Sequence, residues 1–262
     1  MCLLVLAWNA HPRYRLIVAA NRDEFHERPT APLTRWSEPD NIIGGRDLRA
    51  GGAWLAVDTR HRFGVITNFR DLQQPQPDAP SRGHLIPSFL SHEADVGRFL
   101  TALEPQAARY SGFNLLLADD RELWYATNRS EGRTNEPFSQ RLEPGIHGLS
   151  NEYLDTPWPK LLRVRRRFAT WLNEPRGELP RAELFDMLAD RTQVTSDEEL
   201  PRTGLPIERE RTLSSPFVLD ARYGTRCSTI VMIEHSGATL IAERRFDSNG
   251  VSTGESELAL NA

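Results

Sequence analysis

Apolar residues recur along the chain in short runs separated by polar turns, a pattern typical of paired β-strands. The first two runs cover residues 2–8 and 16–20, and the turn between them contains His11-Pro12. The second run ends abruptly on Asn21-Arg22-Asp23-Glu24. Further hairpins are predicted where two apolar runs flank a short polar turn, at 53–57 with 63–67, 113–118 with 122–126, and 228–233 with 238–244.

Apolar residues at helical spacing predict helices over 83–92, 94–103, 157–172 and 181–190. Ser91 is the expected cap of the second helix, and Pro157 or Pro159 lies in the first turn of the third. The remaining long segments are polar or rich in proline, so we expect surface loops at 28–41, 73–80 and 192–216.

Strands and helices are therefore segregated along the sequence, which favours an α+β fold with antiparallel sheets over a doubly wound fold. We expect two stacked sheets with helices outside, in a single domain over residues 1–262. The N- and C-terminal strands are expected to be neighbours, which would bring Arg226 near Cys2.

The net charge and the cysteine content of the sequence argue against several classes of function. A net charge of −4 and a pI near 6.0 argue against a general nucleic-acid binder. The two cysteines, Cys2 and Cys227, indicate neither a disulfide framework nor a metal site, and Cys227 is expected in the core. No apolar run approaches the roughly 20 residues of a membrane span, and no secretory signal is evident. We expect a cytoplasmic protein that binds no metal. Lys160 is the only lysine, and we interpret the excess of arginine as codon usage.

The candidate chemistry begins at Cys2. Methionine is commonly removed before a small residue, so the mature chain would begin with a thiol and an α-amino group on one residue. An α-amino group titrates near about 7.7–8.0, and it can take the proton from a neighbouring thiol nucleophile. A small second residue before an apolar core strand is also common in proteins without such chemistry, and that alternative stays open.

Polar residues recur at the ends of several predicted strands, namely Asp23, Asn68, Asn151 and, before the strand at 228–233, Arg226. Alternation along a strand puts Asn21 and Asp23 on one face and Arg22 on the other. Taken singly, each of these residues is explained by turn structure or surface position. Taken together with Cys2 they supply what acyl transfer needs, because asparagine amides stabilise an oxyanion and a nearby arginine lowers the pKa of a thiol.

Several motifs in this order resemble those of the NRDE family, whose eukaryotic members are called transport and Golgi organisation protein 2. The resemblance covers nearly the whole chain and begins with Met1-Cys2 and Asn21-Arg22-Asp23-Glu24. It continues through short motifs spread along the rest of the sequence: Leu16–Pro29, Gly51–Leu55, Thr67-Asn68, Arg82-Gly83, Gly112–Leu115, Gly148–Asn151, Thr156–Lys160, Tyr223–Arg226 and Ser228-Thr229.

The resemblance implies a four-layer αββα sandwich, because the family is grouped with the N-terminal nucleophile hydrolases. The chain is also similar to the choloylglycine hydrolase and penicillin V acylase group, which carries a catalytic Cys, Asp, two Asn and Arg. Those residues match Cys2, Asp23, Asn68, Asn151 and Arg226 in order. The sequence departs from that group three residues before the Asp, where the hydrolases have Arg and this chain has Ala20.

The leading hypothesis is therefore an amide or acyl hydrolase with Cys2 as nucleophile and an unidentified small-molecule substrate. Asn21, Arg22, Trp54 and Phe69 are the candidate substrate contacts, and the proline-rich loop at 71–82 is the candidate gate. The alternative is a non-catalytic carrier or chaperone for haem or an acyl or lipid ligand, since eukaryotic relatives are linked to haem trafficking and to acyl-coenzyme A metabolism. None of the histidines lies in a haem-binding motif, so no cofactor is expected.

Overall fold

The structure is a computed structural model that describes residues 2–70, 79–129, 136–175 and 179–262. Contacts between Cα atoms divide the chain into two compact units. The first unit comprises Met1–Glu27, Pro144–Ser150 and Leu154–Ala262, and the second comprises Arg28–Glu143 and Asn151–Tyr153. Most of the proline-rich segment that we expected to gate a pocket falls at 71–78, outside the described residues.

The first unit contains an antiparallel sheet, which in the described residues has six strands in the order β10-β1-β2-β11-β12-β13. The strand bounds are, in that order, Gly145–Leu149, Cys2–Trp8, Tyr14–Phe25, Tyr223–Glu234, Thr239–Phe246 and Ser252–Leu260. The chain's first hairpin therefore lies in the middle of this sheet, and β2 separates β1 from β11. The expectation that the terminal strands are neighbours is met by β2 and β11, whereas β1 does not pair with β11.

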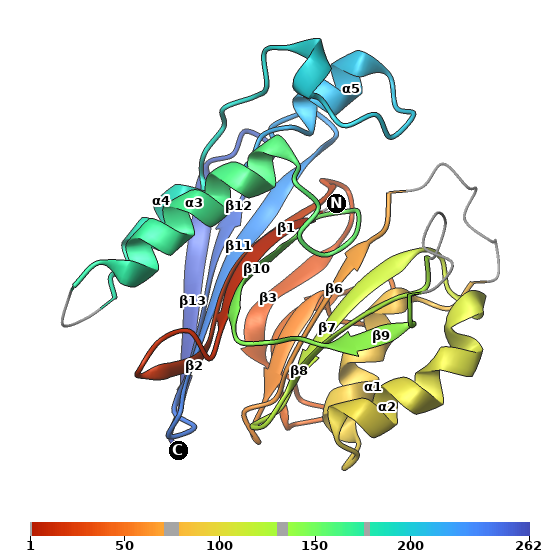
Figure 1. The fold of residues 1–262 in the computed structure, drawn as a ribbon, viewed down its shortest axis with the longest axis vertical. Helices are drawn as coiled ribbons and strands as arrows, with labels where there is room; N and C mark the ends of the chain where they lie inside the picture. The colour runs from red at the N-terminus through yellow and green to blue at the C-terminus, as the bar shows by residue number, and fades with distance from the viewer. Residues whose placement is uncertain (1, 71–78, 130–135, 176–178) are drawn as a thin grey trace. The chain divides into compact units, whose positions relative to one another are not determined.

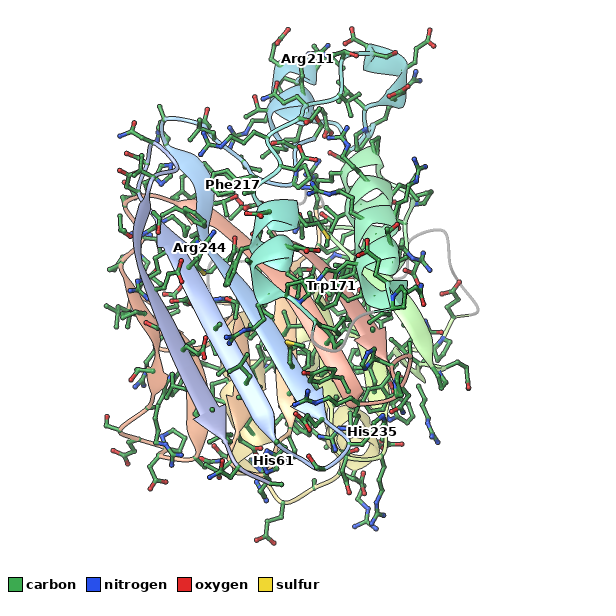
Figure 2. All side chains as sticks on the ribbon, turned by 90° about the vertical axis from the view of Figure 1, so that its left-hand side faces the viewer. His61, Trp171, Arg211, Phe217, His235 and Arg244 are labelled. Carbon is green, nitrogen blue, oxygen red and sulfur yellow. The ribbon has the colours of Figure 1, made fainter. Side chains whose placement is uncertain are left out.

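Two helices cover one face of this sheet, α3 (Pro159–Asn173) and α4 (Arg181–Leu188) (Figure 1). Proline at the start of α3 suits a helix entry, and buried side chains recur along one side of the helix. Trp171 on α3 can be located in Figure 2. It belongs to a core cluster formed by α3, α4 and alternate residues of the strands, among them Leu3, Val5, Ile17, Ala19, Ile230 and Met232.

The second unit contains an antiparallel sheet of seven strands within the described residues, in the order β3-β4-β5-β6-β7-β8-β9. Their bounds are Thr30–Arg35, Ile42–Asp47, Leu55–Asp58, Phe63–Asn68, Phe113–Ala118, Leu123–Thr127 and Ser139–Arg141. The helices α1 (Leu85–Ser91) and α2 (Val96–Leu103) contribute to a core cluster with this sheet (Figure 1). Short 3-10 turns occur at Arg82–His84 and Glu104–Arg109.

The predicted hairpins and helices are confirmed, with ends that differ by a few residues. The predicted cap of the second helix is wrong, because the Asp95 side chain, not Ser91, accepts from the backbone N–H of Arg98 at the start of α2. Residues 28–41 are not a continuous loop, since they contain β3. The polar segment at 192–216 contains a 3-10 turn at Asp197–Glu199 and the short helix α5 (Ile207–Thr212). The expectation of a single domain over 1–262 stays a prediction.

Candidate functional site

The register of the first sheet places the predicted nucleophile beside an arginine. Cys2 on β1 lies opposite Arg22 on β2, and Arg22 lies opposite Cys227 on β11. Residues directly opposite in an antiparallel pair project from the same face. Cys2, Arg22 and Cys227 therefore form a row on the face opposite the core cluster of α3 and α4, whose members on β1 and β2 include Leu3 and Ala19.

Asp23 projects from the other face of β2, toward the helices. Its carboxylate accepts a hydrogen bond of 2.7 Å from the Thr225 hydroxyl, and its backbone carbonyl accepts one of 2.8 Å from the Tyr223 phenol. Only 1% of the Asp23 surface is exposed. Burial raises the pKa of the Asp23 carboxyl, and the Lys160 ammonium and the Arg22 guanidinium act against that rise. This aspartate is thus an enclosed carboxyl whose charge depends on nearby cations.

The thiol of Cys2 is held close to this aspartate. The backbone N–H of Asp23 donates toward the Cys2 sulfur, and the Ser150 hydroxyl donates to the Cys2 carbonyl at 2.9 Å. Burial raises the pKa of the Cys2 thiol and the Asp23 carboxylate adds to the rise, whereas the Asp23 N–H and the Arg22 guanidinium lower it. Cys2 keeps some exposed surface, so the residue is not sealed from solvent.

Arg226 occupies a β-bulge. Thr225 lies opposite Asp23 and Cys227 lies opposite Arg22, so Arg226 is the extra residue on β11 between two consecutive positions of β2. Its guanidinium donates to the Phe25 carbonyl at 2.8 Å. Arg22 acts electrostatically on the Cys2 thiol, and it lies on the face that strand alternation predicts for it.

Asn21 lies on the helix side of β2 with its side chain committed to neighbouring segments. Its amide nitrogen donates to the carbonyls of Leu188 and Pro216 at 2.8 and 2.9 Å, and its oxygen accepts from the Ser228 hydroxyl at 2.6 Å. These bonds connect β2 to the end of α4 and to β11. The substrate contacts predicted for Asn21 and Arg22 stay predictions.

Lys160 is a residue that the sequence interpretation did not select. It lies in the first turn of α3 with 2% of its surface exposed, and its ammonium acts electrostatically on Asp23. A lysine is almost never enclosed to this degree unless it is paired. The signal in the sequence is its status as the only lysine, within the motif Thr156–Lys160, and the interpretation of that status as codon usage passes over this signal.

The remaining predicted residues belong to the second unit. Asn68 ends β6, and its backbone carbonyl accepts a hydrogen bond of 2.8 Å from the side-chain amide of Asn151, a residue with 1% of its surface exposed. The Asn151 carbonyl in turn accepts from the backbone N–H of Arg70. The structure thus brings Asn68 and Asn151 together.

The two aromatic candidates of the second unit occupy different places in it. The Phe69 ring meets the Tyr153 ring edge to face, with centroids 5.0 Å apart. Trp54 precedes β5 and covers Gly45, where an added Cβ would lie 2.1 Å from the indole ring. Glycine at position 45 is therefore what lets the indole lie against the strand.

The family model of Transport and Golgi organisation 2 matches residues 1–248 of this sequence. The chain belongs to the Transport and Golgi organisation 2 family. The mouse Transport and Golgi organization 2 homolog is 32% identical over 265 residues, covering 93% of this chain and 92% of that protein. The human homolog is 33% identical over 267 residues with the same coverage. The family resemblance stated from the sequence motifs is confirmed.

The fold of this member of the Transport and Golgi organisation 2 family is similar to that of a solved hydrolase. The crystal structure of the mutant C2A conjugated bile acid hydrolase from Clostridium perfringens superposes with a TM-score of 0.52, covering 100% of this chain and 97% of that one. The sequence identity is 6%, so the likeness is one of fold. It confirms the predicted class, an α+β fold of two antiparallel sheets flanked by helices, as in N-terminal nucleophile hydrolases.

The described part of this family member gives two further findings. None of its helices combines the length and apolar character needed to cross a bilayer. Within the same residues, no group of three His, Cys, Asp or Glu side chains is arranged to hold a metal ion.

Proposed function

We propose that this protein is an N-terminal cysteine hydrolase that cleaves an amide or activated acyl bond of a small molecule. The observation that carries the proposal is the register of the first hairpin. Because Cys2 pairs with Arg22, the next residue of β2, Asp23, lies beside the start of β1. Removal of Met1 would create the new α-amino group at that point, next to a buried carboxylate that can hold it.

The state of the Cys2 thiol indicates which kind of chemistry is favoured. Burial raises the pKa of this thiol, so it does not exist as a standing thiolate at neutral pH. A base must therefore take the proton during attack. The α-amino group of the same residue is the base that its own covalent geometry supplies, with a pKa of about 7.7–8.0 in unperturbed form.

The proposed reaction has two steps, acylation of Cys2 and hydrolysis of the resulting thioester. The Cys2 sulfur bonds to the substrate carbonyl carbon while the thiol proton passes to the α-amino group. The tetrahedral intermediate collapses, the bond to the leaving group breaks, and the leaving group takes that proton. Water then attacks the thioester, giving its proton to the α-amino group and its oxygen to the carboxylic acid. Departure of sulfur with the proton restores the thiol.

The polar residues of the second unit complete the proposal in the roles predicted from the sequence. Asn68 and Asn151 are assigned to the oxyanion, since asparagine amides donate to developing negative charge. Arg226 keeps its predicted catalytic role, in which a nearby arginine lowers the pKa of the Cys2 thiol. Asn21, Arg22, Trp54 and Phe69 are the proposed substrate contacts. The hydrogen bond from the Asn151 amide to the Asn68 backbone carbonyl supports placing the two residues beside each other in the proposal.

The similarity of fold to the bile acid hydrolase supports an amide or acyl bond as the bond that is cleaved. The solved protein is a conjugated bile acid hydrolase whose mutation C2A replaces a cysteine at position 2. We propose by analogy that the substrate here is a small conjugate with an acyl part and a polar leaving group. A reducing compartment keeps a cysteine as the free thiol, and the cytoplasm is the one we propose.

The test is acylation by p-nitrophenyl acetate at neutral pH, followed as nitrophenol release and as intact mass. The proposal predicts a burst, a single acetyl group on Cys2, and its removal by hydroxylamine as expected for a thioester. Cys2→Ala should lower the burst rate by on the order of 10³-fold or more. Cys227→Ser is the matched control and should react like the wild type, because Cys227 is buried on β11. Equal bursts in wild type and Cys2→Ala would overturn the proposal.

The carrier alternative makes the opposite prediction in the same samples. A carrier would bind hemin or a fluorescent acyl-coenzyme A saturably, with equal affinity in the wild type and in Cys2→Ala, and would show no burst. The burst and the binding curve, measured on one preparation, therefore separate the two functions.

A further inference from the structure

The structure places a single lysine where the candidate hydrolase needs a cation. Lys160 is the only lysine among 32 lysine and arginine residues, and its side chain is enclosed at the start of α3. The helix is seated there by close packing. An added Cβ at Gly148 on β10 would lie 2.7 Å from the Leu161 side chain, so this glycine lets the first turn of α3 approach the sheet.

The residues on either side of Lys160 in the sequence pack the first turn of α3 against β1. Trp158 and Leu161 belong to the core cluster that includes Leu3, the residue directly after Cys2. The Lys160 ammonium also lies over the Trp158 ring at 6.0 Å. Helix packing thus brings an ammonium to the helix face of β1 and β2, the face from which the Asp23 carboxylate projects.

We propose that Lys160 is a positioning residue for the reaction of Cys2: its ammonium neutralises the Asp23 carboxylate, so that the α-amino group of the mature Cys2 stays uncharged and accepts the thiol proton. This inference rests on the proposed function.

The physical reason is the cost of net charge in an enclosed cluster. Asp23 with a protonated Lys160 is neutral, so adding a proton to the α-amino group would create an excess positive charge there. Without the lysine charge, the protonated α-amino group itself becomes the partner of Asp23. The amine is then a cation at neutral pH and cannot accept the thiol proton.

Other ionisable groups near Asp23, Lys160 and the start of β1 stay the same when the Lys160 variants are compared. Arg22 of β2 acts on both Asp23 and Cys2. Tyr223 of β11 contacts the Asp23 carbonyl through its phenol, and burial raises the pKa of that phenol well above its usual range. Glu24 of β2 and Arg209 of α5 also act on Tyr223. None of them is removed when Lys160 alone is changed.

The first experiment is the pH profile of Cys2 acetylation by p-nitrophenyl acetate, read from intact mass. Lys160→Met should move the acid limb of the profile upward by about one pH unit or more, and Lys160→Arg should restore it. Arg163→Met is the matched control, since it removes a cation from the same helix at a residue that bonds to the Thr192 carbonyl instead. An unshifted Lys160→Met profile with normal acetylation would overturn the inference and leave the proposed function standing.

The second experiment needs no activity. A protein grown with ¹³C,¹⁵N-lysine gives one lysine spin system, and its titration can be followed by NMR in the wild type and in Asp23→Asn. The signal should titrate about one pH unit lower when the Asp23 charge is removed. An unchanged titration would overturn the inference even if Cys2 proves unreactive. If Lys160→Met does not fold, the doubly neutral variant Asp23→Asn with Lys160→Met should fold, because it removes both charges of the pair together.

Discussion

Each unit of the chain contains a buried aspartate near a basic residue. The two aspartates differ in which groups donate hydrogen bonds to the carboxylate and balance its charge. In the second unit, Asp58 accepts from the backbone N–H groups of Arg60 and Arg62 at 2.9 Å each and from the Arg62 guanidinium at 2.8 Å. Arg62 also donates to the carbonyls of Leu90 and His92. This clamp closes the turn between β5 and β6 and fastens it to the end of α1.

In the first unit, Asp23 has a hydroxyl donor from Thr225 and a lysine charge from another element. Burial raises its pKa, as is common for carboxyl groups at functional sites. Arginine presents a planar fork that fixes architecture, whereas lysine is a compact charge that responds to its surroundings. A buried ion pair is therefore structural when both carboxylate oxygens are held by nearby donors, and a candidate for chemistry when its charge balance depends on a distant element.

The largest effect should come from breaking the clamp of the second unit. Asp58→Ala leaves Arg62 enclosed without its carboxylate, and removing one partner of a buried pair costs about 3–5 kcal/mol. Urea denaturation measures this loss. The rate of Cys2 alkylation by iodoacetamide should not change, because Asp58 belongs to the other unit. A loss below about 1 kcal/mol would mean that this pair contributes no more than a surface ion pair, which would contradict its structural role.

A smaller effect, on reactivity, should come from Arg22→Met. The Arg22 guanidinium lowers the pKa of the Cys2 thiol, so its removal raises that pKa and reduces the thiolate fraction. A rise of about one unit makes alkylation by iodoacetamide at neutral pH about tenfold slower. Peptide mapping identifies the labelled cysteine, and Arg163→Met serves as the variant that removes a distant cation. An equal rate in Arg22→Met would show that Arg22 does not act on the thiol.

A pH-dependent effect should come from Asp155, which fastens the segment between β10 and α3. It accepts from His147 at 3.0 Å and from the Gly148 N–H at 2.8 Å. Although burial acts in the opposite direction, these bonds and Arg165 lower the pKa of Asp155.

A carboxyl with a lowered folded-state pKa stabilises the protein above the unfolded pKa and loses that contribution as pH falls through the folded one. Asp155→Asn should therefore cost about 1 kcal/mol at neutral pH, and its gap to the wild type should close in acid below the unperturbed aspartate pKa of about 3.9. Asp120→Asn, at an exposed position, controls for the lost charge. A gap that stays constant into acid would contradict the assignment.

The smallest expected effect tests whether the second unit can be stabilised without a change at Cys2. Gly97 lies in α2, and an added Cβ would meet its nearest neighbour, on Trp124, at 3.6 Å, which is ordinary contact. Gly97→Ala should raise the free energy of unfolding by about 0.5–1 kcal/mol. Thermal unfolding and Cys2 alkylation, measured together, should show the first change and not the second. Reduced stability would mean that the α2 backbone tolerates no side chain there.

The first hairpin, the middle hairpins and α3 could be predicted from the sequence because their apolar patterns match the periods of strands and helices. Two kinds of strand could not. The exposed edge strand β13 contains Gly254 and alternating Ser and Glu residues, so it has little apolar signal, and pairing with β12 is what makes it a strand. The strands β3 and β4 contain Pro32 and the pair Gly44-Gly45, which are poor strand residues in isolation.

In the candidate site, too, features set by neighbouring residues could be predicted, and features set by contacts between distant parts of the sequence could not. Alternation along β2 was enough to separate Asp23 from Arg22. The bulge that sets Arg226 apart depends on pairing between residues about 200 positions away in the sequence. Lys160 acts electrostatically on Asp23 from the start of α3, which packs closely on Gly148, and no spacing in the sequence records that packing. Sequence therefore predicted the nucleophile and its aspartate as candidates, and the cation that balances them required the tertiary structure.

The most direct test of the account is the intact mass of the purified protein and of its N-terminal tryptic peptide, which ends at Arg13, before and after brief exposure to p-nitrophenyl acetate at neutral pH. The account predicts loss of Met1 and one acetyl group on Cys2, which hydroxylamine removes when it is added to the folded protein before digestion. A retained Met1, or an acetyl group found only at other residues, would contradict the claim that Cys2 is an N-terminal nucleophile.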